Sequence, residues 1–101
     1  MKKYTIIISE RAKTDIEFFF HHICNVYKRP LTAVRNRQGL YDTISQLSAS
    51  AGSIAISQSD YIQSHFEVGA RRINYKKMAI IFVVEEHYVY IKRVIAGSII
   101  Y

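Results

Sequence analysis

The hydrophobic positions at the start of the chain alternate, and this pattern predicts a strand. Over Lys3–Ile8, the side chains of Tyr4, Ile6 and Ile8 share one face. Ser9 suits the N-cap of a following helix, because its hydroxyl can accept a hydrogen bond from an unpaired amide of the first turn. We therefore expect a strand that leads directly into a helix.

Two stretches with apolar residues at spacings of three and four follow the strand, which indicates two amphipathic helices. The apolar positions are Ala12, Ile16, Phe19, Phe20, Ile23 and Tyr27 in the first stretch, and Leu31, Val34, Tyr41, Ile44, Leu47 and Ala51 in the second. Pro30 ends the first helix and suits the first turn of the second, while Gly52 suits its end. Gly39 should weaken the second helix by about 1 kcal/mol relative to alanine. The pair is predicted to form an antiparallel hairpin.

The remainder of the chain is predicted to be a Ser-rich connection and three strands. The connection is Gly52–Ser64, and the strands are Arg71–Tyr75, Met78–Glu85 and Tyr88–Ile95, separated by polar turns. The middle strand is apolar at consecutive positions, so we expect it to be central and covered on both faces. The predicted class is α+β, with an N-terminal strand, a two-helix antiparallel hairpin and a three-stranded antiparallel meander in one sheet.

Composition limits the size of the fold and the kind of partner. Half of the 101 residues are hydrophobic, which suffices for one core, so 1–101 is expected to be a single domain. Fourteen Lys and Arg against eight Asp and Glu give a net charge of +6, which favours polyanionic or acidic partners. Cys24 is the only cysteine, so we expect no intrachain disulfide and a reducing, cytoplasmic location. The longest apolar run, Met78–Val84, is too short to cross a bilayer, so no membrane partner is expected.

Several short segments resemble the RelE/ParE superfamily, the toxins of type II toxin–antitoxin systems. Ser9–Ile16 is similar to the superfamily's S-x-x-A-x-x-D-[IL] pattern, and Gly69–Ile73 resembles its G-x-R-[RK] entry into a strand. Met78–Val84 followed by Val89–Val94 resembles its final hairpin. These segments occur in the superfamily's order, and the resemblance extends over nearly the whole chain.

The resemblance implies a growth inhibitor that a cognate antitoxin neutralises, and that reaches operator DNA only through this antitoxin. The antitoxin's C-terminal segment would lie along the helix hairpin or beside the basic face of the sheet. ParE-like members bind and poison DNA gyrase, whereas RelE-like and YoeB-like members are endoribonucleases that cleave mRNA on the ribosome. A non-toxic basic module that binds nucleic acid is a lesser alternative. At this point the chain could be either an enzyme or a binding protein without catalytic activity.

Most of the residues that ribonuclease chemistry would need are missing. Attack by an RNA 2′-OH requires a base, an acid and fixed positive charge. The resemblance to RelE-like and YoeB-like enzymes places an arginine near Met78 or Ala79 and a histidine at Ile100, where this sequence has none. Only Tyr101 matches, and it is the candidate catalytic residue if the chain is a ribonuclease. The lack of the strand arginine and of the C-terminal histidine favours the ParE-like function.

Other polar residues give weaker signals. Glu67, His65 and His87 lie near predicted strand ends, where loops can hold functional groups, but a turn histidine is most often only solvated. His21 and His22 are adjacent and therefore point apart on a helix. We expect no metal site and no cofactor.

Six of the fourteen cations lie in the predicted meander, namely Arg71, Arg72, Lys76, Lys77, Lys92 and Arg93. Alternation should separate Arg71 from Arg72, and Lys92 from Arg93, between opposite faces of the sheet. One member of each pair should face away from the helices, on a surface that suits a phosphate backbone or an acidic protein. Solvated cations that discourage sheet aggregation are the alternative. Reversing the charge of Arg71 and Arg72 together is expected to reduce toxicity without unfolding the domain.

Overall fold

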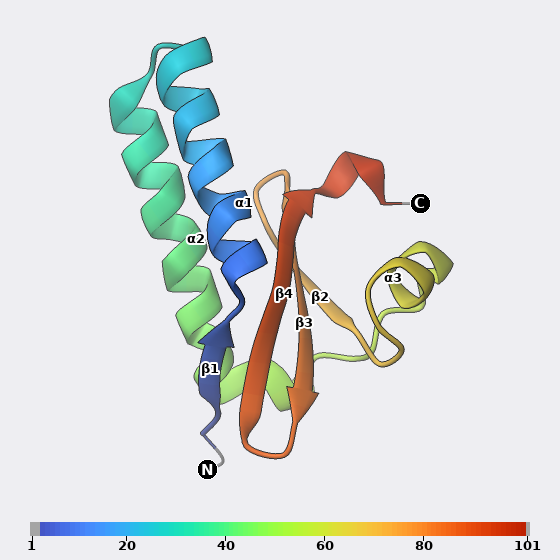
Figure 1. Ribbon diagram of the computed structural model, residues 1–101. Coiled ribbons are helices and arrows are strands. Elements are labelled where there is room, and N and C mark those ends of the chain that lie inside the picture. Colours follow the sequence, from blue (N-terminus) through green and yellow to red (C-terminus); the bar gives the residue numbers. More distant parts are fainter. Residues whose placement is uncertain (1–2, 101) are drawn as a thin grey trace.

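In the computed structural model, which describes residues 3–100, a four-stranded sheet carries helices on both faces (Figure 1). The elements are β1 (Thr5–Ile8), α1 (Glu10–His21), a π-helical segment (His22–Val26), α2 (Pro30–Ser50), a 3-10 turn (Ala51–Ser53), α3 (Asp60–His65), β2 (Arg71–Tyr75), β3 (Met78–Glu85), β4 (Tyr88–Ala96) and a final 3-10 turn (Gly97–Ile99). The strand order is β1-β4-β3-β2, with β1 parallel to β4 and the other pairs antiparallel. The predicted α+β class, helix hairpin and meander are confirmed.

The main core lies between the helix hairpin and one face of the sheet. Its buried members are Ala12, Ile16, Leu40, Ile44, Leu47, Ala51, Ile80, Phe82, Val89, Ile91 and Val94. Tyr4, Ile6 and Ile8 pack against it from β1, as the alternation predicts. The central position of β3 is also confirmed, since Ala79–Phe82 is fully buried between β2 and β4.

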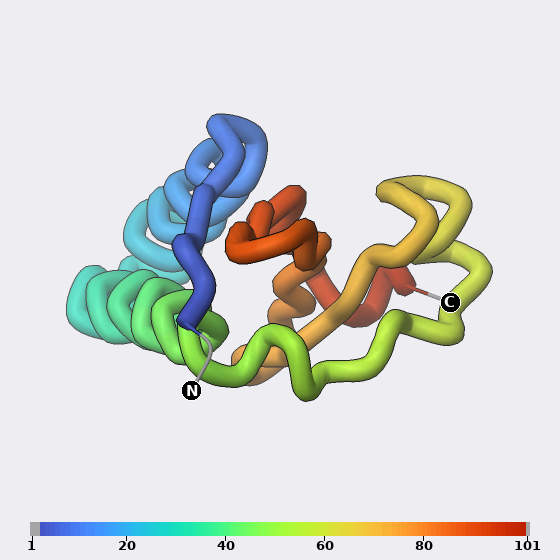
Figure 2. The backbone as a smooth tube through the Cα atoms, turned by 90° about the horizontal axis from the view of Figure 1, so that it is seen from below, coloured from blue at the N-terminus to red at the C-terminus, as the bar shows by residue number. Residues whose placement is uncertain are grey.

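The predicted connection over Gly52–Ser64 is wrong, because it contains the helix α3. The Ser59 hydroxyl caps this helix by accepting a hydrogen bond from the Ile62 amide at 3.3 Å. Ile62 is fully buried and forms a second core with Ala79, Ile81 and other residues on the face opposite the hairpin. Figure 2 shows α3 and the hairpin on opposite sides of the strands. A six-residue helix that buries one side chain leaves no periodic pattern in the sequence, so the prediction missed it.

The predicted apolar stripes are correct near the sheet and wrong at the far end of the hairpin. Leu31 is 71% exposed and Val34 is 48% exposed, because they lie on the face of α2 opposite the buried Ala33 and Asn36. Tyr27 is also exposed, because the π-helical segment His22–Val26 changes the helical period before it. None of the helices within residues 3–100 has the length and apolar character needed to cross a membrane.

Gly39 is required by a close contact between α2 and the sheet. The phenol of Tyr75 occupies the position that a Cβ atom at residue 39 would take. Tyr75 therefore packs against the backbone of α2, and the glycine that the sequence marks as a weak point of the helix is what permits this approach.

Gly39→Ala should therefore destabilise the protein by about 1–3 kcal/mol through overpacking, although alanine is the better helix former. In a Tyr75→Val background the obstacle is absent, and the same substitution should raise the free energy of unfolding. Urea unfolding of the four proteins, followed by circular dichroism, measures both effects. An equal loss of stability in the two backgrounds would contradict the proposed contact.

Candidate functional site

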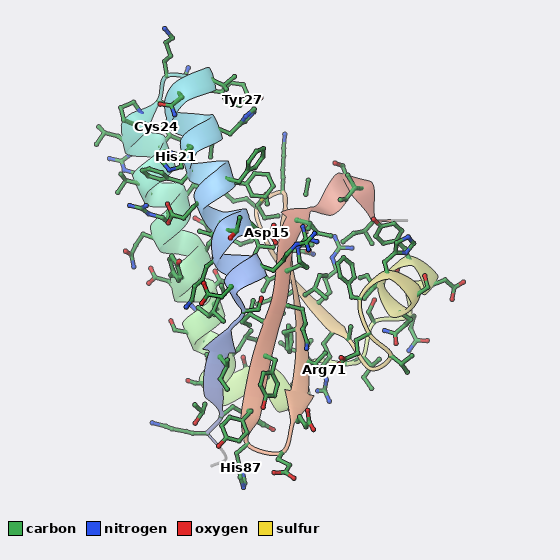
Figure 3. All side chains as sticks on the ribbon, viewed as in Figure 1. Asp15, His21, Cys24, Tyr27, Arg71 and His87 are labelled. Carbon is green, nitrogen blue, oxygen red and sulfur yellow. The ribbon has the colours of Figure 1, made fainter. Side chains whose placement is uncertain are left out.

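Arg71 is held on the hairpin side of the sheet, apart from the other meander cations. Its guanidinium donates hydrogen bonds to the carbonyl oxygens of Ala51 at 3.1 Å and Ile54 at 2.8 Å, and its buried Nε has no hydrogen-bond partner within residues 3–100. Figure 3 shows it near the start of β2, well away from Asp15. Arg71 thus fixes the chain that leaves α2, and the reversal of Arg71 together with Arg72 is expected to disturb the fold.

The side chain of Arg72, from the first half of β2, lines one hollow together with Lys76 and Lys77 of the β2–β3 turn. Arg72 faces away from the hairpin, as predicted, and its Nε donates to Asn74 Oδ1 at 2.9 Å. Lys76 has a φ of 53° in the two-residue turn between β2 and β3, and both lysines are exposed. The three cations border a hollow of about 390 Å³, whose other lining residues are Asn74, Met78, Ala96, Gly97 and Ser98. No carboxylate is among the described residues that line it, so this hollow is suited to anions.

Lys92 and Arg93 share one side of β4, contrary to the predicted separation. Ile81 pairs with Arg93 and Phe82 pairs with Ile91, so Lys92 is the extra residue of a β-bulge. A bulge resets the alternation of side chains, which the sequence pattern does not reveal. Lys92 and Arg93 line one hollow of about 320 Å³ together with Arg11, His65, Phe66 and Glu67.

Both of these β4 cations have acidic partners. Arg93 donates from Nε to Asp15 Oδ2 at 2.7 Å and from a terminal nitrogen to Oδ1 at 3.1 Å, and this pairing raises the pKa of Arg93. Lys92 Nζ lies 3.8 Å from Glu67 Oε1. Positive charge is therefore less available here than beside Lys76 and Lys77.

The remaining sequence candidates do not assemble into a catalytic group. The ring of His65 stacks on Tyr61 at 4.1 Å, and His87 lies in the turn at the opposite end of the sheet from Lys77 (Figure 3). His21 contacts Phe20, whereas its neighbour His22 contacts other rings. Within residues 3–100, no three His, Cys, Asp or Glu side chains are grouped so as to hold a metal ion. Tyr101 lies outside the described residues.

The sequence analysis missed a groove between the hairpin and the β2–β3 turn. This groove has a volume of about 510 Å³ and is lined by Phe19, His22, Ile23, Tyr27, Asn36, Lys76, Lys77, Met78 and Ala96. No pattern within one segment indicates it, because its lining residues come from separate parts of the chain. The two lysines border both the groove and the cationic hollow, so the two cavities meet at this end of the sheet.

The fold is shared with a chain of a solved structure described as the chromosomal ParDE TA system from P. aeruginosa. The TM-score is 0.77 at 18% sequence identity, and the match covers 93% of this chain and 96% of that chain. No family model matches the sequence, and no curated protein matches it. The likeness shows that this chain and a chain of that structure share one fold, which agrees with the predicted arrangement of strand, helix hairpin and meander.

The two neighbouring arginines should respond differently to substitution. Arg71→Ala removes hydrogen bonds from a charged donor to buried carbonyls and should lower the free energy of unfolding by about 2–3 kcal/mol. Arg72→Ala changes a position at the border of a hollow and should cost about 0.5 kcal/mol or less. Urea denaturation of both variants measures the difference, and equal losses would show that Arg72 is also a structural residue.

Proposed function

We propose that the chain is the toxin of a bacterial type II toxin–antitoxin module and acts in the ParE-like manner, by binding and poisoning DNA gyrase in the cytoplasm. The observation that carries the proposal is the shared fold with a chain of a ParDE system over 93% of this sequence. The anion-binding character of the Arg72, Lys76 and Lys77 hollow supports a target surface that carries acidic groups.

The side chains around this hollow favour a binding protein over a ribonuclease. Among its described lining residues, none is a histidine or a carboxylate that would serve as general base or acid. Met78 and Ala79 supply no charge, and Ala79 is fully buried with Ile81 in the second core. Fixed positive charge without a proton-transfer group suits recognition of an acidic partner better than cleavage of RNA.

A RelE-like or YoeB-like ribonuclease is the second candidate, and one observation favours it. Arg72, Lys76 and Lys77 provide the fixed positive charge that would hold an RNA phosphate. The ribosome can supply positioning for such an enzyme, so the toxin itself needs fewer catalytic groups.

A cognate antitoxin is the partner that this function requires. Large apolar side chains are exposed around the far end of the hairpin, namely Phe18, Val26, Tyr27, Leu31 and Val34. Lys28, Arg29 and Arg35 are exposed in the same segment, which has no acidic residue. We propose that an acidic amphipathic segment of the antitoxin covers this end of the hairpin. Operator DNA would then be bound through the antitoxin.

Induction of the chain alone is expected to stop growth, and co-expression of the cognate antitoxin should restore it. The purified chain should inhibit supercoiling by gyrase, while mapping of RNA 5′ ends after induction should show no new translation-dependent cleavage. New cleavage sites without inhibition of gyrase would favour the ribonuclease candidate. Unimpaired growth with abundant folded chain would contradict any toxin function.

Lys76→Glu/Lys77→Glu should weaken gyrase inhibition by about tenfold or more, because like charges at a protein interface repel. Lys3→Glu/Lys13→Glu is the matched control, since it changes the net charge equally at exposed positions away from the hollow. The concentration for half-maximal inhibition of supercoiling separates the pairs of substitutions. An equal effect of both would indicate dependence on net charge alone.

A further inference from the structure

Asn36 presents an unused polar group inside the groove described above. The residue is only 9% exposed and lies on the buried face of α2, yet its carboxamide has no hydrogen-bond partner among residues 3–100. It lines the groove between the hairpin and the β2–β3 turn. The amide atoms are not among the buried side-chain atoms without a partner, so they remain open to the groove, where a ligand can complete their hydrogen bonds.

The walls of the groove suit a planar ring. Phe19, His22 and Tyr27 line it from α1 and the π-helical segment, and the rings of His22 and Tyr27 meet edge to face at 5.3 Å. Met78 contributes an apolar surface from β3. The volume of about 510 Å³ is within the usual range for small-molecule sites, which are mostly apolar with a few placed polar groups.

The border of the groove supplies positive charge. Lys76 and Lys77 line the groove and also the adjoining hollow that contains Arg72, and no described lining residue of either cavity is acidic. An anionic group attached to a ring in the groove would therefore meet two lysines where the cavities join.

We propose that this groove binds a nucleotide, with the base among the aromatic side chains and the phosphate at Lys76 and Lys77. A carboxamide can pair with two atoms on one base edge, and adenine is the base that asparagine matches best in this way. The same chemistry is present in a free nucleotide and in a nucleotide of single-stranded RNA. An acidic peptide would use the lysines but not the planar walls and the buried amide. The site shares Lys76 and Lys77 with the proposed target surface and Tyr27 with the proposed antitoxin surface, but nucleotide binding does not require the toxin function.

The test titrates AMP, adenosine and an oligoadenylate RNA into the purified full-length chain by calorimetry. We expect AMP to bind and adenosine to bind more weakly, since it lacks the phosphate. Tighter binding of the oligonucleotide than of AMP would assign the site to RNA, and equal or weaker binding would assign it to the free nucleotide. Both results support the proposed chemistry, and the binding is measured without reference to growth arrest or gyrase.

Asn36→Leu should lower the affinity for AMP by about tenfold, the effect of losing paired hydrogen bonds in a buried site. Its thermal stability should be nearly unchanged, because the carboxamide makes no hydrogen bond within residues 3–100 that the substitution would break. Asn25→Leu, at an exposed position that does not line the groove, is the matched control and should leave affinity unchanged. Lys76→Ala/Lys77→Ala should weaken AMP binding but not adenosine binding.

Three results would overturn the proposal. One is the absence of heat change with AMP and with the oligonucleotide for the folded wild-type chain. Another is an affinity of the folded Asn36→Leu variant equal to that of the wild type. The third is binding of polyglutamate at the groove, sensitive to the lysine substitutions, without any binding of nucleotides, which would make the groove a site for acidic peptides.

Discussion

One carboxylate connects the first helix of this protein to its last strand. Asp15 accepts two hydrogen bonds from Arg93 and a third, at 3.0 Å, from the backbone amide of Val94. Ser9 adds a bond to the Lys92 carbonyl, and the fully buried Ala12 allows close packing between them. These hydrogen bonds attach α1 to the part of β4 that extends past the end of β1. They therefore fix where the hairpin crosses the sheet. The S-x-x-A-x-x-D pattern is therefore a structural motif, and its presence supports a fold more strongly than an activity.

Local patterns were sufficient to predict the elements that bury many residues. The alternation in β1, the consecutive apolar residues of β3 and the N-cap at Ser9 each arise from neighbours along the chain, and all are found in the structure. The helix α3 was missed because it buries only Ile62. The bulge at Lys92 was missed because it depends on how β3 pairs with β4, which no pattern within one strand encodes. Close contacts such as that of Gly39 with Tyr75 likewise join residues far apart in sequence.

From the sequence, the candidate site could be predicted only as a set of positively charged residues, without the contacts of each side chain. Alternation of side chains along the strand correctly placed Arg71 and Arg72 on opposite faces, but the role of each side chain depends on which groups it contacts. Arg71 meets the carbonyls that end α2, and Arg93 meets Asp15, so these two arginines act in the fold. Arg72, Lys76 and Lys77 meet no carboxylate among the residues that line their hollow. The hydrogen bonds and ion pairs of the folded structure therefore decide which cations remain available to a partner. The amino-acid composition alone does not reveal this.

Because helices cover both faces of the sheet, we expect a ligand or partner to bind at one end of the sheet. The hairpin covers one face, and α3 with the second core covers much of the other, so the central strands offer no broad open surface (Figure 2). At the Lys76–Lys77 turn the groove and the cationic hollow adjoin, and Ala96 at the end of β4 lines both. The described residues place an apolar groove beside a hollow that has cations and no acidic lining residue, and Lys76 and Lys77 line both. That combination is absent from the opposite end of the sheet, where Glu85 and Glu86 place negative charge beside His87.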